Sequence, residues 1–530
     1  RIMSRISYSV KNVKVSLVFY MLVLLLNFFS RRVFLETLGN ELVGLSETVM
    51  GYIGFLNLAE MGISVAIANV LYAPLFRGDR EQVTELVSLL GWLFRLVGIL
   101  IGVLGLIFAA FIPWIFAKDI AGGLDPGLIY AAYFTFLTTT LLSYLVNYKQ
   151  NLLMADQKGY AVTKVLNLCL ILKVLLQMAL LKWAGAGYLT WLALEVLFGV
   201  VFAVWLEAVV RRIYPWLRSS AVRGRGLVKQ YREVFAGVRR IFAHRIAGFL
   251  LVQSDKLIIS QLLSLSMVTF YTNYSTIINR VTTFITGTLQ NSYAGVGNLV
   301  AEGDSKKIRL VFWQFNAMYF WMAGILAFAF YELIDPFIVL WLPAERYEIF
   351  SRPVVLMLVG TLFIGIVRQT VQYFLNAYGL YHDVWAAWTE AGLNVVISIW
   401  ACVHYGVAGV IAGTLVSTGL IVILWRPIFL YRRGFRTSSL EYWITILKYM
   451  AIIAASWLLV GWVVSLGWLP STKSWGGWLV SALVVPTLYA VVCGGAMYFC
   501  SRGMRAFVKL MTDLAKGALL RLKGRLLLRK

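Results

Sequence analysis

Long apolar runs separated by short polar breaks dominate the chain. In residues 28–45, FFSRRVFLETLGNELVGL, an apolar run leads into Arg31 and Arg32, and another apolar run begins almost at once. A membrane-spanning helix needs about 20 mostly apolar residues, and by this measure the pattern predicts fourteen spans. They cover roughly residues 12–36, 42–72, 84–116, 128–154, 160–182, 187–210, 240–262, 267–301, 309–341, 351–378, 384–404, 407–430, 440–467 and 475–500.

The composition supports an all-α integral membrane protein. Of the 530 residues, 60% are hydrophobic and only 14% are charged, whereas a soluble domain carries about a quarter charged residues. The net charge of +24 does not indicate nucleic-acid binding, because the charges lie in loops between apolar runs. Membrane lipids are therefore the expected surroundings, and nucleic acid is not an expected partner.

The basic loops predict how the chain crosses the membrane. The loop 211–240 and the tail 501–530 each hold nine Lys or Arg residues, and alternate loops are poor in them. Since basic loops stay in the cytoplasm, both termini are expected there. In the tail, Phe507, Leu510, Met511, Leu514 and Ala518 recur at helical spacing among basic residues, which favours an amphipathic helix on an anionic leaflet. A simple topology anchor is the alternative.

An internal repeat divides the chain into similar halves. With an offset of 225 residues, SRRVFLETLGNELVGL (30–45) falls on DKLIISQLLSLSMVTF (255–270), and RGDREQV (77–83) falls on EGDSKKI (302–308). The repeat predicts two pseudo-symmetric six-helix lobes, a frame suited to alternating access, followed by two extra C-terminal helices. The expected parts are an N-lobe at 1–212, a basic cytoplasmic linker at 213–239, a C-lobe at 240–431, the extra helices at 432–500 and a basic tail at 501–530.

Charged residues inside the predicted spans are the main candidates for function. Each costs about 2.5–3.5 kcal/mol to insert, and such residues usually face a wet interior. The acidic ones are Glu60, Glu195, Asp255 and Glu390. The basic ones are more numerous: Arg31, Arg95, Lys149, Lys164, Lys173, Arg245, Lys256, Arg280 and Arg368.

The eighth predicted span carries a polar stripe. Asn273, Arg280, Asn291 and Asn298 are separated by 7, 11 and 7 residues, which places them near one line on a helix. A polar stripe on an apolar membrane helix indicates a wet cavity, and hydrogen bonding between packed helices is the alternative.

Further charges favour a cationic lumen. Arg245 and Lys256 share a face of the seventh predicted span, and Arg368 lies in the tenth. With the 225-residue offset, Arg31 falls on Lys256, so each lobe is expected to place a cation at the same point of its first helix. Two such cations suit an anion, since Lys and Arg bind phosphate well; snorkelling to the interface is the alternative. Asp255 and Glu60 are candidates for H⁺ or Na⁺ coupling.

Several kinds of chemistry have no motif in the sequence. It contains no G-x-x-x-x-G-K-[ST] and no H-E-x-x-H, its four Cys lie in apolar runs without paired spacing, and only three His occur. We therefore expect neither an enzyme nor a bound metal or organic cofactor.

The segments SRRVFLETLGNELVGL, NLAEMGISVAIANVLYAPLFRGDREQV (57–83), SDKLIISQLLSLSMVTFYTNYSTIINR (254–280) and NLVAEGDSKKIR (298–309) resemble polysaccharide or O-antigen flippases. That family belongs to the multidrug/oligosaccharidyl-lipid/polysaccharide (MOP) exporter superfamily, and the likeness extends to about residue 430. It implies two six-helix lobes and a cationic lumen, a role carried onto Arg31, Arg280 and Arg368.

The resemblance also implies a function. It implies transfer of undecaprenyl-pyrophosphate-linked oligosaccharide across a bacterial inner membrane. A polysaccharide polymerase and glycosyltransferases are candidate partners, and a complete two-lobed unit favours a functional monomer. Fourteen spans is the count of the related lipid II flippases, so flipping of lipid II is an alternative. A cation-coupled multidrug extruder is a second one, disfavoured by the mostly basic interior. A membrane scaffold without transport is a third.

Overall fold

Helices make up the regular structure of every part of the chain that can be described. The computed structural model describes residues 2–56, 63–231, 251, 253–289, 292–380 and 383–527, and no strand occurs among them. Eleven helices in these ranges are long and apolar enough to cross a membrane. One of them, Val18–Leu56, contains the break between the first two predicted spans, because Gly39 has a left-handed backbone (φ 84°) that ends one helix and starts the next.

The chain forms two compact units, each described here by itself. Unit 1 comprises Arg1–Phe270 with Trp341–Arg346, and unit 2 comprises Tyr271–Leu340 with Tyr347–Lys530. The first unit therefore also holds the helical residues 253–262, which the sequence analysis assigned to the C-lobe.

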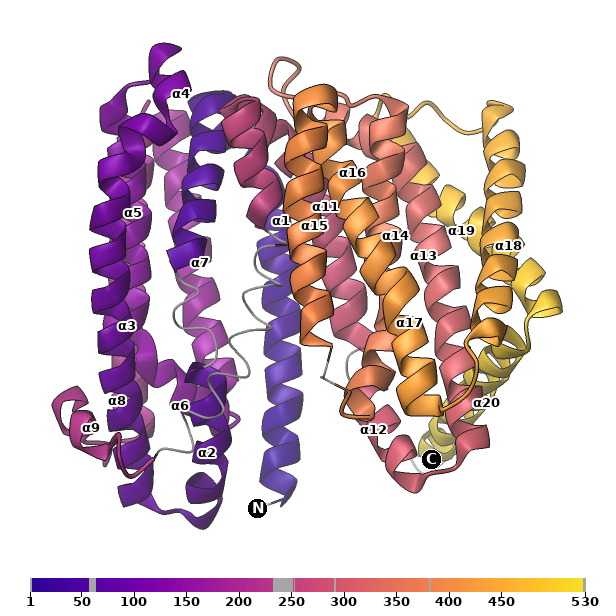
Figure 1. Cartoon of the computed structure of the whole chain (residues 1–530), viewed down its shortest axis with the longest axis horizontal. Coiled ribbons are helices and arrows are strands. Elements are labelled where there is room, and N and C mark those ends of the chain that lie inside the picture. The colour runs from indigo at the N-terminus through magenta and orange to yellow at the C-terminus, as the bar shows by residue number, and fades with distance from the viewer. Residues whose placement is uncertain are drawn as a thin grey trace. The chain divides into compact units, whose positions relative to one another are not determined.

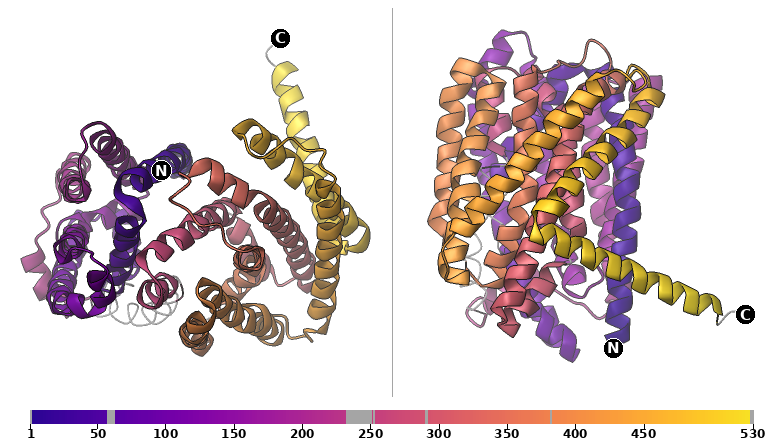
Figure 2. Two further views of the ribbon diagram at one scale, coloured as in Figure 1. Left: turned by 90° about the horizontal axis from the view of Figure 1, so that it is seen from above. Right: turned by 90° about the vertical axis from the view of Figure 1, so that its right-hand side faces the viewer.

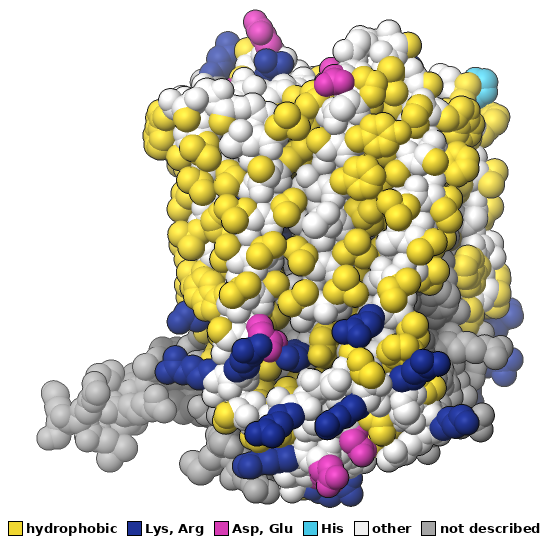
Figure 3. Space-filling view, turned by 90° about the vertical axis from the view of Figure 1, so that its left-hand side faces the viewer, with side chains coloured by type: hydrophobic (Ala, Val, Ile, Leu, Met, Phe, Trp, Pro, Cys, Tyr) yellow, Lys and Arg dark blue, Asp and Glu magenta, His cyan; other side chains and the backbone are white. Residues whose placement is uncertain are grey.

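Unit 1 is a bundle in which α3, α5, α7, α8 and α1 pack against one another (Figure 1). Its surface in Figure 3 is an apolar band with Lys and Arg gathered at the lower rim. The helices are α1 (Ile2–Leu56), α2 (Ile63–Arg77), α3 (Arg80–Ile115), α4 (Ala117–Ala121), α5 (Pro126–Leu145), the 3-10 turn η2 (Asn147–Lys149), α6 (Gln150–Ala155), α7 (Gly159–Trp183), α8 (Tyr188–Ile213) and α9 (Ala221–Leu227).

The first part of the predicted linker is docked on unit 1. The backbone N–H of Ser220 donates to Ser88 Oγ at 3.0 Å, and Tyr231 Oη donates to Glu85 Oε2 at 2.6 Å. A Cβ added to Gly224 would lie 2.1 Å from the Ser88 carbonyl oxygen, so α9 approaches α3 closely. The sequence pattern predicted only a basic connection here and missed this packing.

Unit 2 contains the remaining helices. Trp321 Nε1 donates to the Ala490 carbonyl at 3.0 Å and Trp478 Nε1 to the Leu333 carbonyl at 3.1 Å, which attaches α19 to α13. The helices are α11 (Leu265–Leu289, which begins in unit 1), α12 (Ser292–Glu302), α13 (Ser305–Trp341), α14 (Arg352–Ala377), α15 (Val384–Tyr405), α16 (Val407–Thr418), the π-helical η3 (Gly419–Trp425), α17 (Arg426–Phe429), the π-helical η4 (Leu430–Phe435), α18 (Leu440–Ser465), α19 (Trp475–Cys500) and α20 (Arg502–Leu527).

The repeated turn has the same local geometry in both units. Gly78 and Gly303 have φ values of 76° and 77°. Asp79 accepts a hydrogen bond from the N–H of Gln82, and Asp304 accepts from the N–H of Lys306. Each turn precedes a long helix, 36 residues in α3 and 37 in α13. The Gly-Asp pair thus ends one helix and caps the next in both units.

Candidate functional site

The first candidate site is built on the break at Gly39. In a straight helix, Arg31 and Glu47 would be separated by about 24 Å, because each residue adds about 1.5 Å. Their side chains are instead 3.5 Å apart, from Nη1 to Oε1. The chain therefore reverses at Gly39, and these residues, eight before and eight after the break, meet at the same depth.

Two glycines bring this second half of α1 against residues 253–265. A Cβ on Gly44 would lie 1.9 Å from the Leu265 carbonyl oxygen, and one on Gly51 would lie 3.1 Å from the Leu257 side chain. Glu47 lies three residues after Gly44 and four before Gly51, so all three share a helix face. Small residues let membrane helices approach closely, and this approach carries the Glu47 carboxylate to Lys256.

Glu47 is held by two cations. Lys256 Nζ donates to Glu47 Oε2 at 2.7 Å, and Arg31 Nη1 lies 3.5 Å from Oε1. Arg31 Nη2 also donates to the Thr269 carbonyl at 3.5 Å. The exposed fractions of the Arg31, Glu47 and Lys256 side chains are 18%, 19% and 26%. Two cations on one carboxylate leave one formal positive charge on this cluster, which we call the Glu47 cluster.

The Glu47 cluster holds two of the predicted site residues. Arg31 and Lys256, which the 225-residue offset placed in equivalent positions of two lobes, both belong to unit 1 and both contact the chain's own Glu47. The sequence analysis did not single out Glu47. Its distance from Gly39 equals that of Arg31, which is a local signal for their contact, whereas no local signal indicates the contact with Lys256.

Unit 2 holds a second group of the same charge type. Arg426 Nη1 donates to Gln372 Oε1 at 2.7 Å, and its Nη2 lies 3.7 Å from Oε2 of the buried Glu390. Arg368, on α14, interacts electrostatically with both Arg426 and Glu390. These residues form the Glu390 cluster, which again combines two cations with one carboxylate.

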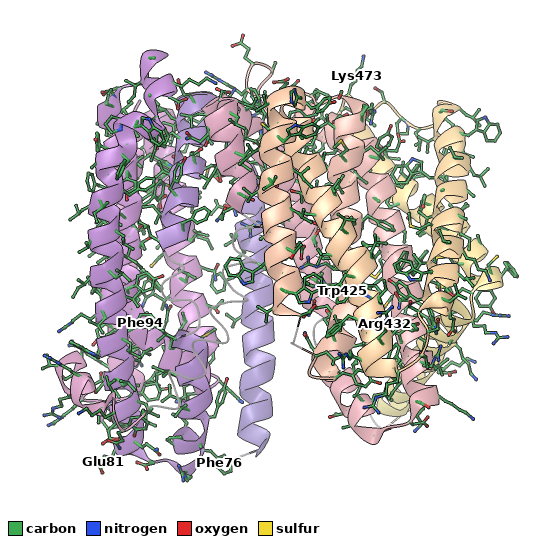
Figure 4. The ribbon with its side chains drawn as sticks, viewed as in Figure 1. Phe76, Glu81, Phe94, Trp425, Arg432 and Lys473 are labelled. Carbon is green, nitrogen blue, oxygen red and sulfur yellow. The ribbon has the colours of Figure 1, made fainter. Side chains whose placement is uncertain are left out.

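An irregular helix presents Arg426. The residue begins the single turn α17, between the π-helical segments η3 and η4, just after Trp425 (Figure 4). Pro427 has no backbone N–H for the helical ladder, and π-helical turns are frequent at functional sites. The sequence analysis missed Arg426, because it lay near the predicted end of an apolar span.

The described substrate-binding candidates outside the Glu47 cluster differ in their exposure to the surroundings of the protein. Asn273 is buried, whereas Arg280 on α11 and Asn298 on α12 are exposed. Arg368 is exposed although its neighbours Ile366 and Val367 are buried.

Of the two ion-coupling candidates, the structure describes only Asp255. Asp255 is buried, with 7% of its surface exposed. Arg245, Glu60 and Asn291 lie outside the described residues.

Two further basic residues of the predicted interior belong to ion pairs in unit 1. Lys149 lies 2.8 Å from Glu207, and Lys173 lies 2.7 Å from Glu195. The side chains of Lys173 and Glu195 are 16% and 15% exposed, close to the values in the Glu47 cluster. These pairs fit a structural role. No group of three or more potential metal ligands from His, Cys, Asp and Glu occurs among the described residues.

Comparison with solved structures identifies the fold. The chain superposes on "Lipid II flippase MurJ, inward closed conformation" with a TM-score of 0.60 and 14% identity, over 93% of this chain and 99% of that one. The chain shares the overall fold of that structure. A second match, "Inward-facing conformation of a multidrug resistance MATE family transporter of the MOP superfamily", has a TM-score of 0.57 and 14% identity, over 78% of this chain and 96% of that one. No protein-family model and no curated protein matches the sequence.

The shared fold and the eleven candidate spans among the described residues confirm the predicted fold class, an all-α protein with many membrane spans. The resemblance to O-antigen flippases in particular stays a prediction, since the two matches are a lipid II flippase and a multidrug transporter.

Proposed function

We propose that the chain is a flippase that moves undecaprenyl-pyrophosphate-linked oligosaccharide across the bacterial inner membrane by alternating access, for surface polysaccharide synthesis. The observation that carries the proposal is the Glu47 cluster, in a fold shared with MOP transporters: two partly exposed cations, Arg31 from a candidate membrane span and Lys256, hold one carboxylate. A pyrophosphate bears more charge and more acceptor oxygens than a carboxylate, so it competes well for Arg31 and Lys256.

In this mechanism Glu47 is an internal substitute for the substrate. It neutralises part of the cationic site when no substrate is bound, which lowers the cost of the charges in the membrane. An arriving pyrophosphate displaces it, and on release the carboxylate returns. The other predicted substrate-binding residues, Arg280, Arg368, Arg245, Asn273, Asn291 and Asn298, stay candidates in this proposal.

Coupling to H⁺ or Na⁺, with Asp255 and Glu60 as candidates, is part of the proposal. So are a monomeric state, cytoplasmic termini and work beside a polymerase and glycosyltransferases. No resident cofactor is needed for this mechanism, since the substrate supplies the only phosphate.

Lipid II is the second candidate substrate. The match to the lipid II flippase covers 93% of this chain, against 78% for the multidrug transporter. Lipid II also has a polyprenyl pyrophosphate, so the Glu47 cluster suits both lipids. A cationic drug is disfavoured, because both charge clusters keep one formal positive charge.

The test is transport by the purified chain in liposomes. Fluorescent lipid-linked oligosaccharide, fluorescent lipid II and a cationic dye are compared, and flipped lipid is measured by its protection from external dithionite. We expect rapid flipping of the oligosaccharide lipid and at least a tenfold loss in the Arg31→Gln/Lys256→Gln variant.

Lys173→Gln is the matched control, since it breaks an ion pair of similar exposure elsewhere in unit 1 and should retain transport. Flipping of lipid II alone would select the second candidate. Transport of the dye alone, or equal loss in the control, would refute the proposal.

A further inference from the structure

The start of α20 is attached firmly to unit 2. Ser501, between α19 and α20, is buried, and its Oγ lies 2.7 Å from Tyr449 Oη. The same oxygen accepts the N–H of Met504 at 3.2 Å, which caps the new helix. A Cβ on Gly503 would lie 2.3 Å from the Trp313 carbonyl oxygen. These contacts set the direction of α20 at its first turn.

That direction runs across the bundle. Figure 2 shows α20 turning away from α19 and extending beyond the other helices of unit 2, roughly across their direction. The 26 residues of α19 are apolar and about 39 Å long, which is enough to span a bilayer. A helix that turns sideways at the end of a span lies along the membrane surface.

Four exposed cations of α20 lie on one side of the helix. At about 100° per residue, Arg502, Arg505, Lys509 and Lys516 fall within roughly 60° of one another, and all four are exposed. Between residues 502 and 527 the sequence holds seven basic residues and a single acid, Asp513.

Between residues 504 and 511, the opposite side of α20 is apolar. Met504 is buried against unit 2, whereas Leu510 and Met511 are 45% and 50% exposed. Phe507, at helical spacing between them, is half-buried. The apolar face therefore continues past the attached first turn without cover from the described part of unit 2.

We propose that α20 binds the anionic headgroup surface of the leaflet in which α19 ends. Its apolar face enters the boundary between headgroups and acyl chains, about 5–10 Å deep, while the basic face contacts lipid phosphates. The charge on α20 selects an anionic bilayer over a zwitterionic one. Its attachment at the end of a span places it at the bilayer edge, where lipid is the nearest partner. This inference does not depend on the transported substrate.

The test uses the full chain in lipid nanodiscs. A fluorescent probe is attached at Leu510→Cys, with Cys500→Ser to remove the exposed native thiol, and quenching by brominated lipid is measured with and without phosphatidylglycerol. Thr512→Cys, exposed on the other side of the helix, is the matched control position.

We expect strong quenching at position 510 with phosphatidylglycerol, little at 512, and less at 510 without the anionic lipid. Each basic residue near an anionic leaflet strengthens binding about fivefold, so a variant with Arg505, Lys509 and Lys516 changed to Glu should lower the ratio of bound to free helix at least about a hundredfold. These positions are exposed, so the variant should fold normally.

Equal quenching at 510 and 512, or quenching independent of phosphatidylglycerol, would overturn the proposal. A second measurement tests whether aqueous iodide quenches the probe at position 510. If protection from iodide depended on protein concentration and not on lipid charge, two copies of the chain would be in contact there, and the membrane proposal would be overturned.

Discussion

Replacing Glu47 with Gln separates a binding role of the Glu47 cluster from a structural one. Loss of one partner from a fully buried ion pair costs about 3–5 kcal/mol, whereas exposed pairs contribute about 0–1 kcal/mol. The three side chains are 18–26% exposed, so we expect Glu47→Gln to lower the free energy of unfolding by about 2 kcal/mol. The substitution also removes the carboxylate that pairs with Arg31 and Lys256. Because both cations can then bind a phosphate ligand, its affinity should increase about tenfold, equivalent to about 1.4 kcal/mol.

Glu195→Gln is the control, because Glu195 pairs with Lys173 at 2.7 Å and is similarly exposed. It should lose comparable stability without a gain in affinity. Stability is measured by thermal unfolding of the purified chain, and affinity by binding of a fluorescent polyprenyl pyrophosphate. Glu47→Gln is also expected to flip lipid more slowly, because the displacing carboxylate is absent at release. Unchanged or weaker binding in Glu47→Gln, with the same destabilisation as the control, would show that Glu47 is only structural.

Three further predictions concern packing, pH and the start of α20. Gly44→Ala should destabilise the chain by about 1–3 kcal/mol in thermal unfolding, because its Cβ would overlap a backbone carbonyl, whereas Gly392→Ala, with no atom within 4 Å, should not. Burial, and then the nearby Glu41 carboxylate, raises the pKa of Asp119. The folded chain therefore binds a proton at Asp119 more tightly than the unfolded chain does. Folding stability is lost as the pH rises through the raised pKa, because the carboxyl must then ionise in the folded chain. Asp119→Asn should therefore stabilise by up to about 0.5 kcal/mol at pH 7 and have no effect at pH 3, and a constant difference across this range would contradict the assignment. Ser501→Ala should lower the stability of the start of α20 by about 1–2 kcal/mol, because a helix cap and a buried hydrogen bond are lost. Amide hydrogen exchange in α20 should become faster. Unchanged exchange would show that Ser501 does not attach the helix.

Some of the site follows from local signals and some does not. The break at Gly39 and the repeated Gly-Asp turns are encoded locally, since a left-handed residue and a capping side chain act within a few positions. The internal repeat indicated that Arg31 and Lys256 occupy equivalent positions, but not that both would contact Glu47. Distant partners were harder to predict. Glu47 contacts Lys256, 209 positions away, and Arg426 contacts Gln372, 54 positions away. No local spacing predicts such contacts, because they depend on which helix faces meet.

The helical class and the presence of many membrane-length apolar helices follow from the amino-acid pattern alone, although eleven candidate spans occur among the described residues against the fourteen predicted. In a bilayer every backbone polar group must be satisfied within its own segment, so an apolar run of sufficient length becomes a helix whatever its neighbours are. Only the tertiary structure determines which charged side chains form ion pairs with one another. That outcome depends on helix rotation and on close approach at small residues such as Gly44 and Gly51, and both arise when helices pack together.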